Sequence, residues 1–464
     1  MTKGSPWASD EGTAVGPSAA LAGVAAVVVG LHGLVGLRDP YSYDEALTVA
    51  WFVKAPTVVD SVTRQAVFNN HPLISLLDHL VYSVTGSSSP EVMRIIPLIA
   101  LSLSVALLAY AATRRWGWWQ GALAAAILAT NPLVLGEGRL VRGYALLLLC
   151  AEVSAALLVW MSELDEPPRW LEVAYLIVVA FGVLAHLYMV LVIVVELVFV
   201  WRTPALRRPR IIAATAGGIA IGMAIQLPLL AAGSPGQAGR AFQPTFLWFV
   251  ARSLLGHEWI AVILAATLVT TAALHWRHDR RVAWLAGAVT LELVGVWLVA
   301  PTNLYTRFFL WLVPAAVLAT IVGARHWQRR LPSPWSMVGW LACCVIVVAQ
   351  AASSVAYSET DNASIRVAST LLAIQQQGGK VCLLRGSWPM LAPEVSASIV
   401  EADVPQSCDI VASLSQGLDQ PYLDSVQRRY QHQVVIPAGT PAILFTDRPP
   451  ECVSDTPPPG CWSH

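Results

Sequence analysis

Long apolar runs, separated by short polar connectors, follow one another along most of the chain. Runs of this kind are typical of helices that cross a hydrocarbon core of about 30 Å. Eleven spans are predicted, at residues 18–37, 91–112, 118–135, 144–161, 170–185, 187–203, 211–231, 258–275, 283–300, 308–324 and 336–356. The first run has neither a strongly basic leader nor a small-residue cleavage site, so we expect it to remain as a span.

One more apolar stretch, HPLISLLDHLVYSVTG at residues 71–86, has a different pattern. Its polar side chains recur at helical spacing, at Ser75, Asp78, His79 and Tyr82. The opposite face carries Leu73, Ile74, Leu77, Leu80, Val81 and Val84. An amphipathic helix of this length is expected to lie in the membrane interface and not to cross it. Residues 38–90 then form one large loop on a single side of the membrane.

The arginines favour one side of the membrane. They gather on every second connector, at Arg114 and Arg115; Arg202, Arg207, Arg208 and Arg210; Arg277, Arg280 and Arg281; Arg325, Arg329 and Arg330. Connectors rich in Lys and Arg lie on the cytoplasmic side. Residues 1–17 are therefore expected in the cytoplasm. The expected external segments are the loop 38–90, the connectors near 136–143, 232–257 and 301–307, and the tail 357–464. These assignments predict a multi-pass protein of the plasma membrane.

The tail, residues 357–464, differs from the rest of the chain in composition. It contains polar loops, short strand-like runs such as KVCLLRG and PAILFTD, and a Pro-rich end, which together predict a small external α/β domain. Four of the seven cysteines lie there: Cys382, Cys408, Cys452 and Cys461. An even number in an exported domain favours disulfides, with three possible connectivities, of which we expect Cys382 with Cys408 and Cys452 with Cys461. Cys150, Cys343 and Cys344 lie within spans, where we expect them to serve packing.

The predicted fold is therefore an all-α polytopic membrane domain, residues 18–356, with amphipathic helices in its first external loop and a C-terminal α/β domain. Composition agrees, because 56% of the 464 residues are hydrophobic and only 12% are charged. The formal net charge of zero hides the segregation of the arginines and gives no reason to expect a nucleic-acid partner.

Two adjacent carboxylates, Asp44 and Glu45, stand in the first external loop within DPYSYDEALT. The series Ser42-Tyr43-Asp44-Glu45 fits a capping box, in which Ser42 caps a helix and Glu45 reaches back to the Ser42 amide. This structural role would account for Glu45. It leaves Asp44 open to two interpretations, a solvated acid in the first helical turn or a functional carboxylate.

Arginines on the predicted external face are the second unusual feature, since positive charge is scarce there. The set contains Arg94, Arg139, Arg142, Arg240, Arg252 and Arg307. Glu137 lies beside Arg139, and Tyr144 lies beside Arg142. Interfacial snorkelling accounts for Arg240 and Arg252. For Arg139, Arg142 and Arg307 we favour anion binding, because guanidinium groups suit phosphate, and a phosphate at membrane level belongs to a lipid.

Two histidines, His71 and His186, lie at the external ends of predicted spans or loops. A metal site would need further ligands at suitable spacing, and the sequence offers none. Hydrogen bonding or substrate contact is the functional interpretation of both, and a plain structural role is the alternative.

Several short motifs follow one another in a recognisable order. They are the acidic pair, His71-Pro72, Arg-x-x-Pro at 94–97, Arg-x-x-Arg-x-Tyr-Ala-Leu at 139–146, His-x-Tyr at 186–188 and Arg-Phe-x-x-x-x-x-Pro at 307–314. In this order the chain resembles, over roughly residues 18–330, the polyprenyl-phosphate-sugar-dependent membrane glycosyltransferases of the C superfamily. Within it, the resemblance is to the branch of protein O-mannosyltransferases and lipid A aminoarabinose transferases.

The chain departs from the family pattern at two positions. Leu73 stands where the family often has the second proline of His-Pro-Pro, and Leu140 stands where many members have an acidic residue. Glu137 lies about one helical turn before Leu140, so it could reach the same space.

The resemblance implies transfer of a mannose- or arabinose-type sugar, with inversion, from a polyprenyl phosphate to an acceptor hydroxyl of a glycan, glycolipid or protein outside the membrane. Asp44 would be the base, with Glu45 in reserve. The phosphate would bind Arg139, Arg142, Arg307, Arg94 and Lys54, and the substrate would contact His71, Glu137, Tyr144, His186 and Tyr188. No cofactor is required, and binding of a hydrated divalent ion by Asp44 or Glu137 is kept as an alternative.

Two other classes remain as alternatives. A transporter or flippase of lipid-linked sugars would usually place charged residues near mid-membrane, where this sequence has few, chiefly Glu196 and Glu292. A non-catalytic partner in envelope assembly is the other alternative, since Leu140 departs from the family motif.

Overall fold

The computed structural model describes residues 15–33, 37, 41–64, 71–231, 245–256, 258–276, 280–299, 306–333, 335–360, 370–371, 373–384, 398–400, 408–413, 428–436, 442–454, 458 and 461. The chain divides into two compact units. The first, here the helical unit, comprises residues 1–35, 62–77 and 94–355. The second, here the loop-and-tail unit, comprises residues 36–61, 78–93 and 356–464.

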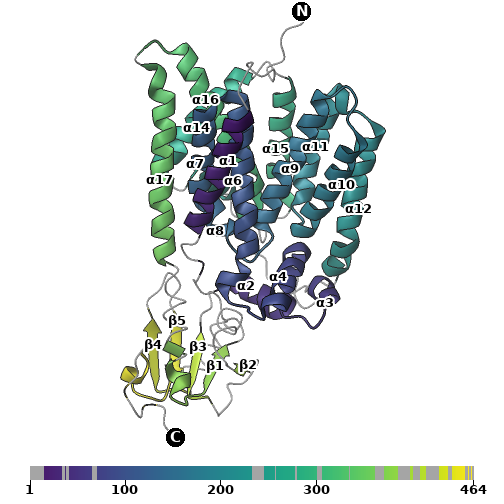
Figure 1. The fold of residues 1–464 in the computed structure, drawn as a ribbon. Helices are drawn as coiled ribbons and strands as arrows, with labels where there is room; N and C mark the ends of the chain where they lie inside the picture. Colours follow the sequence, from purple (N-terminus) through teal and green to yellow (C-terminus); the bar gives the residue numbers. More distant parts are fainter. Residues whose placement is uncertain are drawn as a thin grey trace, which may run out of the picture. The chain divides into compact units, whose positions relative to one another are not determined.

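Each of the eleven predicted spans coincides with a helix (Figure 1). These helices are α1 (Val15–Gly33), α6 (Ile95–Trp116), α7 (Trp118–Thr130), α9 (Tyr144–Glu163), α10 (Arg169–Ala185), α11 (Met189–Arg202), α12 (Pro209–Ala231), α14 (Trp259–Trp276), α15 (Arg280–Val299), α16 (Val313–Arg330) and α17 (Val338–Thr360). The expected polytopic helical fold is therefore confirmed.

The helices differ in length. Judged by length and composition, five stretches of the described residues can each cross a membrane, and two bent helix pairs bring the number to seven. Other predicted spans are shorter, such as α10 with 17 residues and α11 with 14. About 20 residues are needed to cross a bilayer without tilt or thinning, so the shorter helices fall below that length.

Small residues allow the helices of the helical unit to pack closely. Helix α10 packs against α12, and α14 against α16. A Cβ at Gly218 would lie 2.8 Å from the carbonyl oxygen of Leu176, and one at Gly323 would lie within 2.1 Å of that of Leu268. Close backbone approach at small residues is characteristic of helices that associate in membranes.

The predicted amphipathic helix is α4 (Pro72–Thr85), which begins in the helical unit and ends in the loop-and-tail unit. Its 14 residues span about 21 Å, which is too short to cross a bilayer. Most of the polar stripe is buried, with Asp78 fully shielded from solvent and Tyr82 half-buried, whereas Leu80 and Val84 are 45% and 87% exposed. The polar face of α4 therefore packs inside the protein and part of its apolar face is uncovered.

The remaining short elements connect the long helices. They are α2 (Tyr43–Thr48), the π-helical turn η1 (Val49–Val53), α3 (Val58–Thr63), α5 (Pro90–Met93), α8 (Pro132–Gly138), α13 (Phe246–Leu255) and the 3-10 turns η2 (Pro204–Leu206), η3 (Thr306–Leu312), η4 (Trp335–Met337) and η5 (Pro450–Cys452).

The C-terminal tail forms a five-stranded mixed sheet in the order β2-β1-β3-β5-β4. Its strands are β1 (Val381–Leu384), β2 (Ser398–Val400), β3 (Ile410–Ser413), β4 (His432–Ile436) and β5 (Ala442–Thr446). Strand β1 is parallel to β2 and β3, and β5 is antiparallel to β3 and β4. The two strand-like runs singled out in the sequence are β1 and β5.

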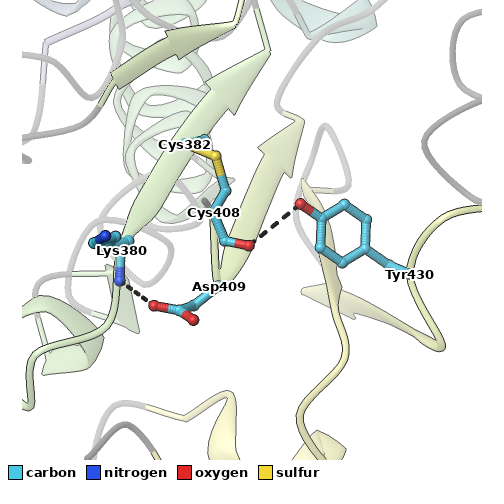
Figure 2. Close-up of a disulfide and its surroundings, with 5 residues drawn as sticks. All are labelled: Lys380, Cys382, Cys408, Asp409 and Tyr430. Atoms are coloured by element: carbon cyan, nitrogen blue, oxygen red, sulfur yellow. Dashed lines mark hydrogen bonds between the residues drawn. A yellow bond between two sulfur atoms is a disulfide. The ribbon is translucent and has the colours of Figure 1, made fainter. Parts of the chain in front are cut away.

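Both expected disulfides are confirmed, Cys382 with Cys408 and Cys452 with Cys461. Figure 2 shows the first, which joins β1 to the residues just before β3. Beside it the Lys380 backbone N–H donates to Oδ2 of Asp409 at 2.7 Å, and the Tyr430 hydroxyl donates to the Cys408 carbonyl at 3.4 Å. The bridge and these bonds together fix the adjacent starts of β1 and β3.

The other three cysteines, Cys150, Cys343 and Cys344, are free thiols within α9 and α17. They therefore lie inside helices predicted to span the membrane.

Candidate active site

The turn between α7 and α9 is built by a capped short helix. Asn131 caps α8 and accepts hydrogen bonds from the backbone N–H groups of Leu133 and Val134. Helix α8 is bent by 59° from α7, and it ends at Gly138. The N–H of Arg142 then closes a tight turn onto the Leu140 carbonyl at 2.6 Å. This turn gathers Glu137, Arg139, Arg142 and Tyr144 within eight residues.

A glycine brings the start of α9 against the end of α10. Gly143 precedes the first residue of α9, and Ala185 is the last residue of α10. A Cβ at Gly143 would lie within 1.8 Å of the Ala185 carbonyl oxygen and 3.1 Å from Nδ1 of His71. The same carbonyl oxygen is 3.0 Å from that Nδ1. Only glycine at position 143 leaves room for both the Ala185 carbonyl group and the His71 ring, so it allows the hydrogen bond between them.

Aromatic and imidazole rings surround this point. The His71 ring centroid is 4.7 Å from that of His186 and 5.8 Å from that of Tyr144. His186 is 5.2 Å from Tyr144 and 5.3 Å from Tyr188, and Tyr188 stacks on Phe308 at 4.4 Å. The group of rings is thus built in the helical unit by the residue just before α4, by α9, by η3 and by the α10–α11 turn.

Two arginines lie at the same group of rings. Arg142 is buried, with 2% of its surface exposed. Arg307, at the start of η3, places Nη1 3.8 Å from Oε2 of Glu137 and its guanidinium carbon 5.7 Å from the Tyr144 ring centre. We call His71, Arg142, Tyr144, His186 and Arg307 the arginine–histidine cluster.

The cluster is positively charged, and its histidines are neutral. Burial, followed by Arg142 and then Arg307, lowers the pKa of His186 to about 3. Burial is also the largest cause at His71, where Arg142 again contributes, and the pKa is well below its ordinary value of 6.5. The two arginines therefore carry the charge, and such a buried cationic site favours an anion such as phosphate.

The predicted capping box is confirmed. The Ser42 N–H donates to Oε2 of Glu45 at 2.9 Å, and the Glu45 N–H is 3.4 Å from the Ser42 hydroxyl. The Glu45 carboxylate is thus engaged in starting α2, whereas Asp44, next to it in the same turn, is half-buried.

The predicted site residues are divided between the two units. Seven come together in the helical unit around the arginine–histidine cluster: His71, Glu137, Arg142, Tyr144, His186, Tyr188 and Arg307. Arg94, almost fully buried, and Arg139 belong to the same unit, where they lie at the start of α6 and the end of α8. Asp44, Glu45 and the exposed Lys54 belong to the loop-and-tail unit.

Asp78 is a candidate residue that the sequence analysis did not select. It is fully buried, and within the described part of the chain neither carboxyl oxygen has a hydrogen-bond partner. Burial, with a smaller contribution from the charge of Glu45, raises its pKa well above the ordinary value. The signal was its place in the polar stripe of α4, which by itself indicates only an amphipathic helix. We call Asp44, Glu45 and Asp78 the carboxyl cluster.

Metal ligation was also open in the sequence. Within the part of the chain that the structure describes, no group of three or more His, Cys, Asp or Glu side chains is arranged to hold a metal ion.

No protein-family model matches the chain, and no curated protein matches its sequence. Solved structures do match. ArnT from Cupriavidus metallidurans in the apo state is 12% identical, with a TM-score of 0.60 over 92% of this chain and 97% of ArnT. The same protein bound to undecaprenyl phosphate is 13% identical, with a TM-score of 0.59 over 93% and 98%.

The Archaeoglobus fulgidus oligosaccharyltransferase, in complex with zinc and sulfate, is 11% identical. Its TM-score is 0.54 over 81% of this chain and 62% of the oligosaccharyltransferase. At such identities the likeness establishes the fold. The chain thus shares the polytopic fold of ArnT over 92% of its length.

Proposed function

We propose that this chain is an inverting glycosyltransferase of the C superfamily. It moves a mannose- or arabinose-type sugar from a polyprenyl phosphate to an acceptor hydroxyl on the outer face of the plasma membrane. The observation that carries the proposal is the arginine–histidine cluster, a buried cationic and aromatic site at the ends of membrane helices. The shared fold with ArnT, which has been crystallised with undecaprenyl phosphate, supports a lipid phosphate as the anion.

The arginines act on the leaving phosphate. As the bond between the anomeric carbon and the phosphate oxygen breaks, negative charge grows on that oxygen. Fixed guanidinium groups of Arg142 and Arg307 stabilise this charge in the transition state more than in the bound donor. Arg94, Arg139 and Lys54 supply further positive charge to the same phosphate. Because cationic side chains carry the charge, the proposed reaction requires no metal ion.

Asp44 acts on the acceptor. Its carboxylate takes the proton of the acceptor hydroxyl as that oxygen attacks the anomeric carbon from the face opposite the phosphate, which inverts the configuration. Glu45 is the less suitable base because its carboxylate accepts the Ser42 N–H in the capping box. The residues of the ring group, Tyr144, His186 and Tyr188, contact the sugar, since aromatic faces pack against its C–H groups.

The acceptor is a glycan, a glycolipid or a protein of the cell envelope. The cytoplasmic N-terminus and external tail predicted from the arginines place the cluster on the outer side. Two disulfides in the tail agree with an oxidising compartment.

The transporter alternative is weakened at Glu196, one of its two mid-membrane glutamates. The other, Glu292 in α15, has no hydrogen-bond partner on either carboxyl oxygen within the described residues. Glu196 in α11 accepts hydrogen bonds from Ser154 at 2.5 Å and Tyr175 at 2.8 Å, and Glu152 in α9 accepts one from Ser104 at 2.7 Å. These bonds join neighbouring helices, which is a structural use of a buried carboxyl group. A transport pathway would instead be expected to expose such groups to a substrate.

The test uses purified protein in lipid nanodiscs with radiolabelled polyprenyl phosphomannose and phosphoarabinose, and envelope extract as the source of acceptors. Wild type is expected to transfer one of the two sugars. Asp44→Asn should lose transfer by about 10² to 10⁴-fold while it still binds the donor, because only the base is removed. Asp60→Asn is the matched control, since Asp60 caps α3 with Thr57 on the surface of the same unit.

The outcomes separate the alternatives. If wild type neither binds nor transfers from either donor, the glycosyltransferase proposal is wrong and a transporter or assembly role replaces it. If wild type transfers and Asp44→Asn transfers equally well, the base assignment alone is wrong.

A further inference from the structure

The inference concerns His71 and what its free ring nitrogen recognises. His71 precedes α4 and has 7% of its surface exposed. Its ring lies against His186 and Tyr144, and both Arg142 and Arg307 are close enough to act on its charge. A histidine at a phosphate site would ordinarily be expected to serve as a cation. Burial and the nearby guanidinium group of Arg142 instead hold the pKa of His71 well below its ordinary value, so the ring is neutral.

The backbone fixes the tautomer of His71. Its Nδ1 lies 3.0 Å from the carbonyl oxygen of Ala185, which can only accept a hydrogen bond. Nδ1 must therefore carry the proton and donate it. In the neutral ring the lone pair is then on Nε2, which points away from that carbonyl. Nε2 is buried, and no described residue gives it a hydrogen-bond partner.

His186 has the opposite tautomer. The backbone N–H of Tyr188 donates to Nδ1 of His186 at 3.2 Å, so this nitrogen must be the acceptor. The proton of the neutral His186 ring is then on Nε2. The two neighbouring imidazoles thus offer complementary groups, an acceptor at His71 and a donor at His186.

A bare phosphate does not satisfy the His71 acceptor. The phosphodiester oxygens of the donor carry no proton, and a phosphate monoester such as the spent lipid phosphate, with a second pKa of about 6, is mostly dianionic at pH 7. The oxygens of both can therefore pair with Arg142 and Arg307 but not with a lone pair. Leaving a buried acceptor unpaired costs binding free energy. A ligand that suits the whole cluster therefore combines an anion with a nearby O–H group. A sugar joined to phosphate has this combination, because its hydroxyls lie a few bonds from the phosphate oxygens.

We propose that Nε2 of His71 accepts a hydrogen bond from a hydroxyl of the donor sugar, so that the cluster prefers the sugar-loaded lipid to the spent lipid phosphate. The inference rests on the proposed function and deepens it. It gives a physical reason for product release, since the lipid phosphate left after transfer has lost the partner of His71. His71 then discriminates substrate from product, and the arginines hold both.

The test measures dissociation constants for two lipids of equal chain length, undecaprenyl phosphate and its phosphomannose or phosphoarabinose derivative, with full-length protein in nanodiscs. His71→Leu should weaken binding of the sugar lipid about tenfold and change binding of undecaprenyl phosphate by less than about twofold. His71→Gln should restore most of the preference, since its amide can donate to Ala185 and accept from the sugar. Arg142→Gln should weaken both lipids.

Equal weakening of both lipids by His71→Leu, no weakening of either, or a failure of His71→Gln to restore the preference would overturn the inference. If His71→Leu does not fold, as judged by its melting temperature, His71→Phe takes its place, because it keeps a ring but no lone pair. Wild-type protein that binds neither lipid overturns the proposed function as well. Wild-type protein that binds both lipids equally overturns only this inference.

Discussion

The arginine–histidine cluster and the carboxyl cluster both contain side chains that burial keeps uncharged, and they differ in the charge that remains. In the helical unit, burial and the two arginines keep His71 and His186 neutral, which leaves only the guanidinium groups charged. In the loop-and-tail unit, burial and the neighbouring Glu45 favour the protonated form of Asp78. One cluster therefore has fixed positive charge, and the other contains a carboxyl group, that of Asp78, that keeps its proton above its ordinary pKa. In the proposed transfer the fixed positive charge would hold the phosphate, and Asp44 would take the proton.

Among variants of the arginine–histidine cluster, the largest expected effect follows from the removal of a fixed charge. Arg307→Gln should lower the transfer rate about 100-fold, because the leaving phosphate loses one guanidinium group. Arg169→Gln is the matched control, since Arg169 starts α10 at the end opposite His186 and is exposed. Transfer rates in nanodiscs measure both variants. A loss smaller than about threefold in Arg307→Gln would remove that residue from the phosphate site.

The next effect tests whether the geometry of the same cluster depends on its glycine. Gly143→Ala should destabilise the protein by about 1–3 kcal/mol, because the added methyl group meets the Ala185 carbonyl. Gly23→Ala in α1 is the control, since a Cβ there has no atom within 4 Å. Thermal unfolding in detergent compares the two. An unchanged melting temperature in Gly143→Ala would show that the contact of α9 with α10 can relax.

The carboxyl cluster is tested by pH. In the folded protein Asp78 keeps its proton at pH values where the unfolded chain, with a pKa near 3.8, loses it. Wild-type stability therefore falls as pH rises above 3.8, by up to about 1.4 kcal/mol per pH unit, until the folded pKa is reached. Asn has no proton to lose, so the melting temperature of Asp78→Asn relative to wild type should increase from pH 4 to pH 7. A difference that does not change with pH contradicts the raised pKa.

The smallest expected effect concerns a metal ion. If the arginines carry the charge of the leaving phosphate, treatment with EDTA should leave the transfer rate within about twofold of its starting value. A loss that Mg²⁺ or Mn²⁺ restores would assign part of the charge to an ion. Repeating the treatment on Asp44→Asn and Glu137→Gln would then show which carboxylate holds it.

The features that the sequence predicted depend on patterns within short, continuous stretches of the chain. Apolar runs locate the helices because a bilayer imposes hydrophobicity on the whole length of each span. The capping box at Ser42 and Glu45 is complete within four residues. The Cys452–Cys461 disulfide also closes a short separation, of nine residues.

The features that the sequence did not predict depend on residues far apart in the chain. The tautomer of His71 is set by the carbonyl of Ala185, 114 positions away. The need for glycine at 143 comes from that same carbonyl, on another helix. Asp78 looked like one member of a polar stripe, and only the packing around α4 shows that its carboxyl group is buried. Residue type and order identified the members of the cluster, but not the hydrogen bonds that set their chemistry.

The two disulfides of the tail impose an order on the maturation of the protein. Such bonds form in oxidising compartments, so under the proposed topology, with the tail outside the membrane, the sheet acquires them only after the tail has crossed. A polypeptide arrested before that step would hold Cys382 and Cys408 as thiols beside a fully inserted set of helices. Under that topology the last step of maturation takes place on the outer side of the membrane, and a host for producing the protein needs thiol oxidation there as well as membrane insertion.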